Sequence, residues 1–191
     1  MNNWQRLVRV TAPVAPVVTL AEIKKHCRAE YFTDDDAYLA ELVEVATAYV
    51  EGPNGIGVCL MPQTWRLSLD YFPCEIVIPL GPVTAITGIE YTDSAGDPAT
   101  LLTWRADFDA SPCRIWPARD EAWPVSTLQP GAVKVTFTAG YSAVPADLKA
   151  AIKLLVGNLY ENREATTETK ITDLPLGVSA ILERYRVGRV A

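Results

Sequence analysis

The sequence contains little of what catalytic and metal sites usually need. Its 191 residues include one histidine, His26, and four cysteines that form no C-x-x-C pair. Because zinc sites need clustered Cys or His ligands and nucleophilic triads need a histidine base, this composition argues against both kinds of site. His26 lies in a predicted helix without a motif around it, so we interpret it as structural and expect no metal, no cofactor and no catalytic residues.

Long hydrophobic runs are missing as well. No apolar stretch approaches the length of about 18 residues that marks a membrane-spanning helix, and the chain does not open with a basic segment followed by an apolar one. We therefore expect no membrane association and no signal peptide. Four cysteines without a pattern fit a reducing cytoplasm, although their number also permits two disulfides.

Basic residues are too few for a protein whose whole surface binds nucleic acid or an anionic membrane. The chain has 17 Lys and Arg against 23 Asp and Glu, which gives a net charge of −6. The charge is uneven, since residues 1–18 and residues 176–191 each carry +2 and leave −10 on the remainder. Basic ends on an acidic body are either solvated tails or the means by which a ring subunit reaches an acidic neighbour.

Helical spacing of apolar residues occurs near both ends of the chain. Thr19 and Glu22 fit a capping box at the start of one helix, and Thr33 followed by three aspartates predicts the cap of the next. The apolar residues then recur with the helical period of 3.6. These patterns predict helices over residues 20–30, 33–50, 145–163 and 176–185.

Between these helices the apolar period changes from 3.6 to 2. Trp65, Leu67 and Leu69 alternate with polar residues, as in a strand with one buried face. Further strand-like runs occupy residues 76–80, 86–92, 100–105 and 133–138. Turn residues rich in Gly, Pro and Asp separate these runs, which is typical of a small antiparallel sandwich or barrel.

We therefore predict an α+β fold in which an antiparallel β-sandwich or barrel-like module is inserted into a helical core. The module spans residues 64–141, and the core combines residues 19–63 with residues 142–191. Residues 1–18, which contain a Pro-spaced run, are expected to form an extended N-terminal arm.

A glycine run and an acidic run could be taken for a phosphate-binding loop and a calcium-binding loop, but the residues around them argue against both. The glycines Gly52, Gly55 and Gly57 follow a predicted helix, whereas a phosphate-binding loop follows a strand and opens a helix. The acidic run 34–36 lacks the alternating ligands of a calcium loop. We interpret the first as a helix stop and the second as a helix cap.

The β-module carries two features that leave other functions open. Its acids Asp107, Asp109, Asp120 and Glu121 are either solvated loop charges or paired carboxylates of a glycoside hydrolase. Its aromatic group is either core and loop packing or the surface of a carbohydrate-binding or tail-associated recognition module. This group comprises Trp104, Phe108, Trp116 and Trp123.

The end of the β-module and the helix after it carry a resemblance to a known family. The run Phe-Thr-Ala-Gly-Tyr-Ser-Ala-Val-Pro at residues 137–145 leads into a helix that closes on Asn-Leu-Tyr-Glu-Asn-Arg-Glu at residues 158–164. This arrangement resembles the head–tail connector, or adaptor, proteins of long-tailed phages and gene transfer agents. Four further segments are similar to the family: residues 20–25, 33–36, 63–65 and 182–186.

The resemblance implies a non-enzymatic structural subunit of the particle neck, assembled in the bacterial cytoplasm. Family members form a ring, usually of twelve copies, between the portal protein and the next neck or tail-completion (stopper) protein, and double-stranded DNA passes transiently through the ring. Such a subunit needs adhesive termini. The resemblance thus implies portal docking by the C-terminal residues Leu182, Arg184, Tyr185, Arg186 and Arg189 and inter-subunit contact by the arm residues Arg6, Arg9, Val14 and Val17.

Overall fold

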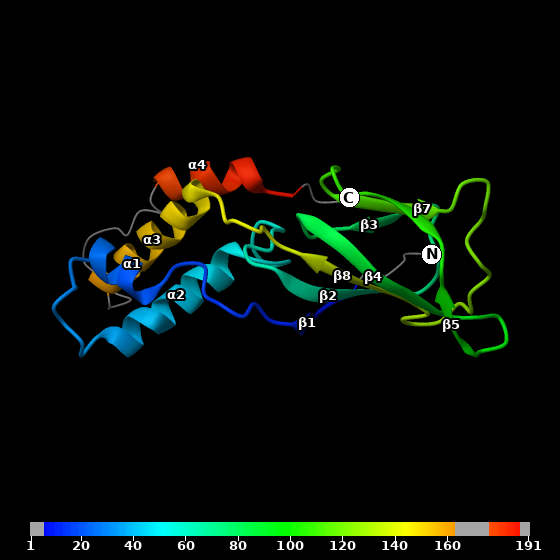
Figure 1. Cartoon of the computed structure of the whole chain (residues 1–191), viewed down its shortest axis with the longest axis horizontal. Coiled ribbons are helices and arrows are strands. Elements are labelled where there is room, and N and C mark those ends of the chain that lie inside the picture. The colour runs from blue at the N-terminus through cyan, green and yellow to red at the C-terminus, as the bar shows by residue number, and fades with distance from the viewer. Residues whose placement is uncertain (1–5, 163–175, 188–191) are drawn as a thin grey trace. The chain divides into compact units, whose positions relative to one another are not determined.

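The chain folds into two compact units in the computed structural model, which describes residues 6–162 and 176–187 (Figure 1). Among these residues, the β unit comprises 6–13, 62–141 and Val187, and the helical unit comprises 14–61, 142–162 and 176–186. The predicted α+β class is confirmed. Each unit is therefore assembled from segments that lie far apart in the sequence.

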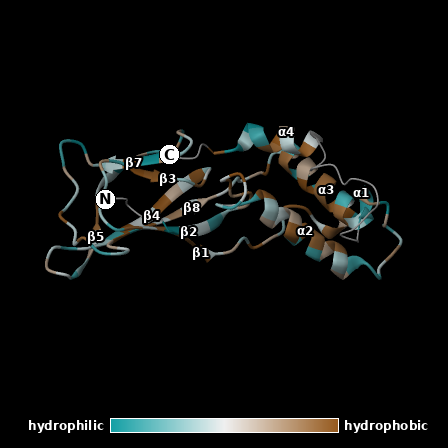
Figure 2. Cartoon of the chain, turned by 180° about the vertical axis from the view of Figure 1, so that it is seen from behind, coloured by the Kyte–Doolittle hydropathy of each residue, from teal (hydrophilic) through white to brown (hydrophobic). Residues whose placement is uncertain are grey.

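The helical unit is organised around its third helix. Helix α3 contacts α1, α2 and α4, and Figure 2 shows hydrophobic residues along α2 and α3. Each helix buries one side, which explains the helical spacing of apolar residues in the sequence. The helices of the described residues are α1 (Leu20–His26), α2 (Asp36–Val50), α3 (Ala146–Glu161) and α4 (Leu176–Tyr185).

Helix α1 has the predicted capping box but is shorter than expected. The backbone N–H of Glu22 donates to Thr19 Oγ1 at 3.3 Å, and the N–H of Thr19 donates to Glu22 Oε2 at 2.9 Å. The helix ends at His26 instead of residue 30, because the backbone of Arg28 turns into the left-handed region at φ 56°.

The predicted cap of α2 is wrong in position and in chemistry. The N-cap residue is Asp35, not Thr33, and its side chain makes no capping hydrogen bond. Its carboxylate instead accepts a hydrogen bond from the Tyr160 hydroxyl on α3 at 2.5 Å. Asp36 forms an ion pair with Lys24 of α1 at 2.6 Å. The acidic run therefore joins α2 to neighbouring helices.

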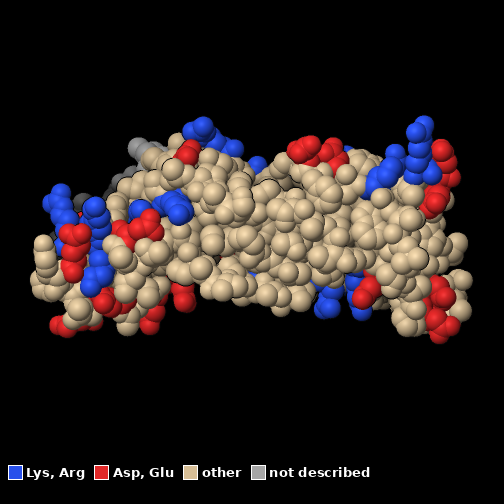
Figure 3. Space-filling model, viewed as in Figure 1, with Lys and Arg blue, Asp and Glu red and all other residues tan. Residues whose placement is uncertain are grey.

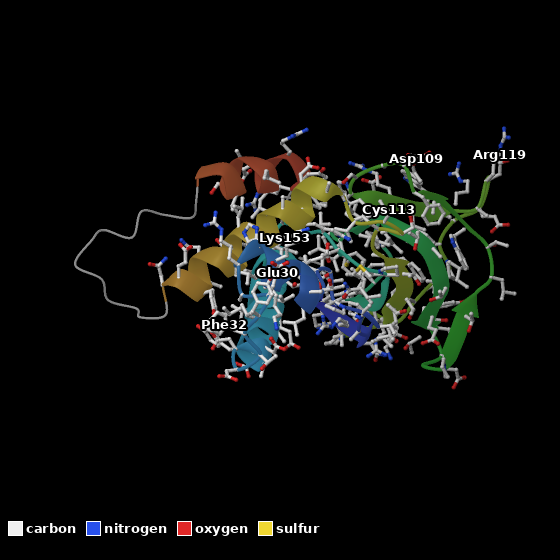
Figure 4. The ribbon with its side chains drawn as sticks, turned by 60° about the vertical axis from the view of Figure 1, so that its left-hand side comes forward. Glu30, Phe32, Asp109, Cys113, Arg119 and Lys153 are labelled. Carbon is white, nitrogen blue, oxygen red and sulfur yellow. The ribbon has the colours of Figure 1, made fainter. Side chains whose placement is uncertain are left out.

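Glu22 joins α1 to α3, and we expect its contribution to stability to depend on pH. Its carboxylate accepts the Thr19 backbone N–H and lies 3.2 Å from Lys153 Nζ (Figure 4 labels Lys153). The hydrogen bond from the Thr19 backbone, with smaller contributions from the Thr19 side chain and Lys153, lowers the pKa of Glu22 from 4.5 to about 2. Because its folded-state pKa is lowered, the stabilisation is complete above pH 4.5 and disappears as the pH falls towards 2.

Replacing Glu22 with glutamine should therefore lower the free energy of unfolding of the helical unit by about 1 kcal/mol at neutral pH, the usual value of a capping interaction. The difference from wild type should shrink as the pH falls from 4.5 to about 2. Urea unfolding followed by circular dichroism at several pH values measures this. Glu41→Gln, at an exposed position of α2, is the control. A difference that is the same at every pH would contradict the assignment.

The described strands of the β unit form two antiparallel sheets, neither of which closes into a barrel. The five-stranded sheet has the order β1-β2-β8-β4-β5, and the three-stranded sheet has the order β3-β7-β6. The strands are β1 (Arg6–Thr11), β2 (Gln63–Leu69), β3 (Ile76–Ile78), β4 (Val83–Thr92), β5 (Pro98–Leu101), β6 (Trp104–Asp107), β7 (Cys113–Pro117) and β8 (Val133–Ala139). The central strands β2 and β8 alternate between buried and partly exposed residues, so one face of the large sheet covers the core.

One strand prediction needs correction, and two strands were not predicted. The run 100–105 is not one strand, since β5 ends at Leu101 in the large sheet and β6 begins at Trp104 in the small one. The segment Cys113–Pro117, for which no strand was predicted, forms β7. Residues 6–11 of the predicted arm form β1, which pairs with β2.

The helices of the described segments offer no membrane span, since none of them combines sufficient length with sufficient hydrophobicity. All four cysteines lie in these segments and are free thiols. Burial, with a smaller effect of Asp107, raises the pKa of Cys113 to about 11. The two disulfides that the cysteine count permitted are therefore not formed.

Candidate functional site: partner-binding surfaces

The C-terminal helix α4 is packed onto the helical unit by part of the predicted docking group. Leu182 is only 5 % exposed and Val178 is fully buried, while Arg184 and Arg186 are exposed. Helix α4 contacts α3. Leu182 thus belongs to the hydrophobic core of the described chain, whereas Arg184 in the last turn of α4 and Arg186 just after it are accessible to a partner beside the exposed Glu183.

The end of α4 is tied to the beginning of α3 through one carboxylate. Asp147 lies in the first turn of α3, where the helix dipole favours negative charge. Arg184 Nη1 lies 3.8 Å from Asp147 Oδ2. Desolvation raises the pKa of Tyr185, and the hydrogen bond from its hydroxyl to Asp147 raises it further. These contacts hold α4 in place beyond its buried apolar residues.

The remaining C-terminal positions have different surroundings. Arg186, which follows the last residue of α4, has its Nη2 2.9 Å from Oε1 of Glu183 in the last turn of that helix. Val187 is 8 % exposed and belongs to the β unit, where its side chain packs beside Gly81. Arg189 lies outside the described residues.

The structure does not bring the four predicted arm residues into one patch. Arg6 and Arg9 lie on β1 of the β unit, whereas Val14 and Val17 belong to the helical unit. Val14 is fully exposed, but Val17 is 5 % exposed and packs into the core. Arg6, Arg9 and Val14 are therefore accessible to a partner, whereas the buried side chain of Val17 fixes the chain to the helical unit.

Arg6 holds β1 against the rest of the large sheet. Its Nη2 lies 2.5 Å from Asp70 Oδ1, and the same oxygen accepts the backbone N–H of Gly131 at 3.0 Å. Gly131 has a φ of +73°, which strains any other residue. Asp70 thus joins the N-terminal strand to the turn before β8. Arg9 is exposed, and no ion pair is formed by it within the described part of the chain.

Two pairs of exposed apolar residues were not found from the sequence. Val8 and Val10 on β1 are 48 % and 53 % exposed. Tyr31 and Phe32, between α1 and α2, are 95 % and 66 % exposed. Val8 and Val10 lie in a segment that the sequence predicted only as an extended arm. Tyr31 and Phe32 lie in a turn, where apolar residues show no periodicity. Two adjacent aromatic residues just after a helix were the one sequence signal for the second pair.

The aromatic group of the β-module does not form one stacking platform. Trp123 stacks on Phe72 at 4.9 Å between ring centroids, and its Nε1–H donates to the Cys74 carbonyl. Trp104 and Trp116 are half-buried on β6 and β7, where Trp104 lies opposite Pro117 and Trp116 opposite Arg105. The geometry does not favour the carbohydrate-binding alternative.

The candidate catalytic acids either stabilise a turn or lie exposed on a loop. Asp107 Oδ1 accepts the backbone N–H groups of Asp109 and Ala110 at 3.0 and 3.1 Å, which is an Asx turn. Asp120 lies 3.7 Å from Arg119, and both side chains are about nine-tenths exposed. Figure 4 shows Arg119 pointing away from the β unit. No set of three metal-ligating side chains occurs within residues 6–162 and 176–187.

Comparisons with known proteins agree on one family. The family described as phage gp6-like head–tail connector protein matches residues 126–186. A solved chain from the neck of an empty gene transfer agent particle, computed with C6 symmetry, is 30 % identical with a TM-score of 0.79. A chain from the virion of a native particle is 29 % identical with a TM-score of 0.78, and one from a native neck computed with C12 symmetry is 26 % identical with a TM-score of 0.68. Each alignment covers 97 % of both chains. The search of curated proteins gives no match.

Proposed function

Because the chain belongs to the head–tail connector family, we propose that it is a structural ring subunit in the neck of a phage or gene transfer agent particle. The ring lies between the portal protein and the stopper protein and continues the channel through which DNA passes. The protein binds its neighbours and catalyses no reaction. It assembles in the bacterial cytoplasm and ends in the neck of the finished particle.

The observation that carries this proposal is the match, over 97 % of both chains, to a protein of a particle neck computed with C12 symmetry. Cyclic symmetry requires each subunit to present two different, complementary surfaces to its neighbours. A net charge of −6 also suits a wall along which DNA slides, because acidic side chains repel phosphate. Figure 3 shows charged side chains of both signs on the face that it draws.

The C-terminal helix supplies the surface that binds the portal. In this proposal Arg184 and Arg186 contact an acidic portal surface and Arg189 extends this contact, while Leu182 and Tyr185 hold α4 in position on α3. The exposed side chains of Arg184 and Arg186 and the buried side chain of Leu182 support this division of roles. The N-terminal residues Arg6, Arg9 and Val14 contact the neighbouring subunit, and Val17 anchors the arm.

Reversing the charge of α4 tests portal binding. The double variant Arg184→Glu, Arg186→Glu should bind the purified portal of the same particle about 100-fold more weakly, since two attractive contacts become repulsive. Biolayer interferometry at two salt concentrations measures this, because an electrostatic contact weakens with salt. The control is Arg119→Glu, a charge reversal on an exposed loop of the β unit. Equal binding by the double variant and wild type would contradict the assigned docking surface.

A further inference from the structure

Strand β1 is incompletely covered within one copy of the chain. Five of its six residues are exposed, and only Leu7 is partly covered. Arg9 lies opposite Trp65, which is buried, yet Arg9 itself is exposed. Neither face of β1 is therefore packed in the normal way, and its two exposed valines lie on a sheet edge of the kind that readily associates with another chain.

The same sheet presents its second edge on the opposite side. The strand order β1-β2-β8-β4-β5 places β1 and β5 at the two edges. Four strand spacings separate them, which is about 19 Å. Since each pairing is antiparallel, β1 and β5 run in the same direction. Two different edges on opposite sides are what a cyclic, head-to-tail contact requires.

The two edges differ in charge. The sequence before Glu22 contains Arg6 and Arg9 and no acid. Residues 67–104, which include β4 and β5, contain five acids and no Lys or Arg. Three of these acids, Glu90, Asp93 and Asp97, lie on the β4–β5 hairpin. A basic edge and an acidic edge attract each other when copies meet in rotation, while like edges repel.

The hairpin also borders a hollow into which a side chain fits. The hollow has a volume of about 230 Å³ and is lined by Tyr91, Pro98 and Thr100 and by the charged residues Glu90 and Lys134. Val8 and Thr100 lie on the same face of the sheet. Val8 pairs with Arg66 and Arg66 with Thr136, and two residues along the same face Lys134 pairs with Glu90 and Glu90 with Thr100. Pro98 has no N–H to donate, so side chains and charges contribute more to such a contact than a full backbone ladder.

We propose that the β1 edge of one copy docks against the β4–β5 hairpin edge of the next copy, so that the large sheets adjoin around the ring. This inference rests on the proposed ring function and names the surface that receives the N-terminal strand. Val8 enters the hollow, and Arg9, on the other face of the sheet, is attracted by Asp93 and Asp97 at the hairpin turn.

Cysteine cross-linking in assembled particles tests this contact. The variant Val8→Cys, Thr100→Cys is made in a background with Cys27→Ser and Cys74→Ser, which removes the two thiols that are not buried. Purified particles are treated with a bis-maleimide shorter than the distance between the two edges of one copy. The paired variant should give a ladder of multimers on a denaturing gel, and each single cysteine variant should give none.

The outcomes separate the contact from the ring function. Joined particles without a ladder would overturn the docking proposal and leave the connector function standing. Dimers from Val8→Cys alone would overturn it in favour of a β1–β1 contact. A charge exchange provides a second measurement: Arg9→Glu and Asp97→Arg should each reduce joined particles about tenfold, and the double variant should restore them. Failure of the double variant to restore joining, where each single variant impairs it, would also overturn the proposal.

Discussion

The Phe137→Ala variant is expected to lose about 3–5 kcal/mol of the free energy of unfolding of the β unit, enough to unfold many domains of this size. Phe137 is fully buried on β8, where it lies opposite Trp65 on β2 and Ile86 on β4. Replacing it with alanine removes the largest side chain that is fully buried among the described residues and leaves a cavity between the paired strands.

Urea unfolding followed by two signals locates this loss. The tryptophans of the described chain, Trp65, Trp104, Trp116 and Trp123, all belong to the β unit, so their fluorescence follows that unit. Circular dichroism at the helical band follows the helical unit. The control is Phe108→Ala, since Phe108 is 44 % exposed and its truncation should cost less than about 1 kcal/mol. Equal losses for both variants would contradict the described core.

The Leu182→Asp variant should release α4 and reduce the number of joined particles about tenfold or more. Leu182 is 5 % exposed, and a carboxylate at that position would be buried without a partner, at a cost of several kcal/mol. Because α4 contacts α3 through this side of the helix, the variant should detach α4 while the rest of the helical unit stays folded.

Amide hydrogen exchange and electron microscopy measure the two parts of this expectation. Exchange within α4 should become faster in Leu182→Asp, and heads without tails should accumulate in the lysate. Ser179→Asp adds the same charge at an exposed position of the same helix and should change neither measurement. If α4 exchanges rapidly but particles join normally, the portal-docking role of α4 is wrong.

Periodic elements could be predicted from the sequence, because their residues bury one side. The apolar spacing of α2 and α3 follows their buried faces, from Leu39 to Val50 and from Leu148 to Val156. The alternation of β2 and β8 follows the pleat of the large sheet. In these elements the local pattern and the tertiary burial agree, so the sequence pattern was sufficient.

Edges and ends could not be predicted in the same way. Strand β1 exposes both faces, so it has no alternation to detect. Thr33 satisfies the usual rule for a helix cap, but the contacts of Asp35 with Tyr160 and of Asp36 with Lys24 fix the beginning of α2. Such contacts join residues far apart in sequence, and local propensity does not contain them.

The candidate site was predicted from a resemblance more than from chemistry. The basic charge of the termini indicated partner contacts there. It did not show that, of the predicted docking residues, Arg184 is exposed and Leu182 is buried. The exposed valines of β1 were missed, because exposure depends on the sheet edge that the strand occupies.

Deletion of the gene in a particle-producing strain tests the central claim most directly. Negative-stain electron microscopy of the lysate then counts joined particles, free heads and free tails. A connector predicts separate heads and tails, with joined particles restored when the wild-type gene is supplied. Normally joined particles in the deletion strain would contradict the proposed function.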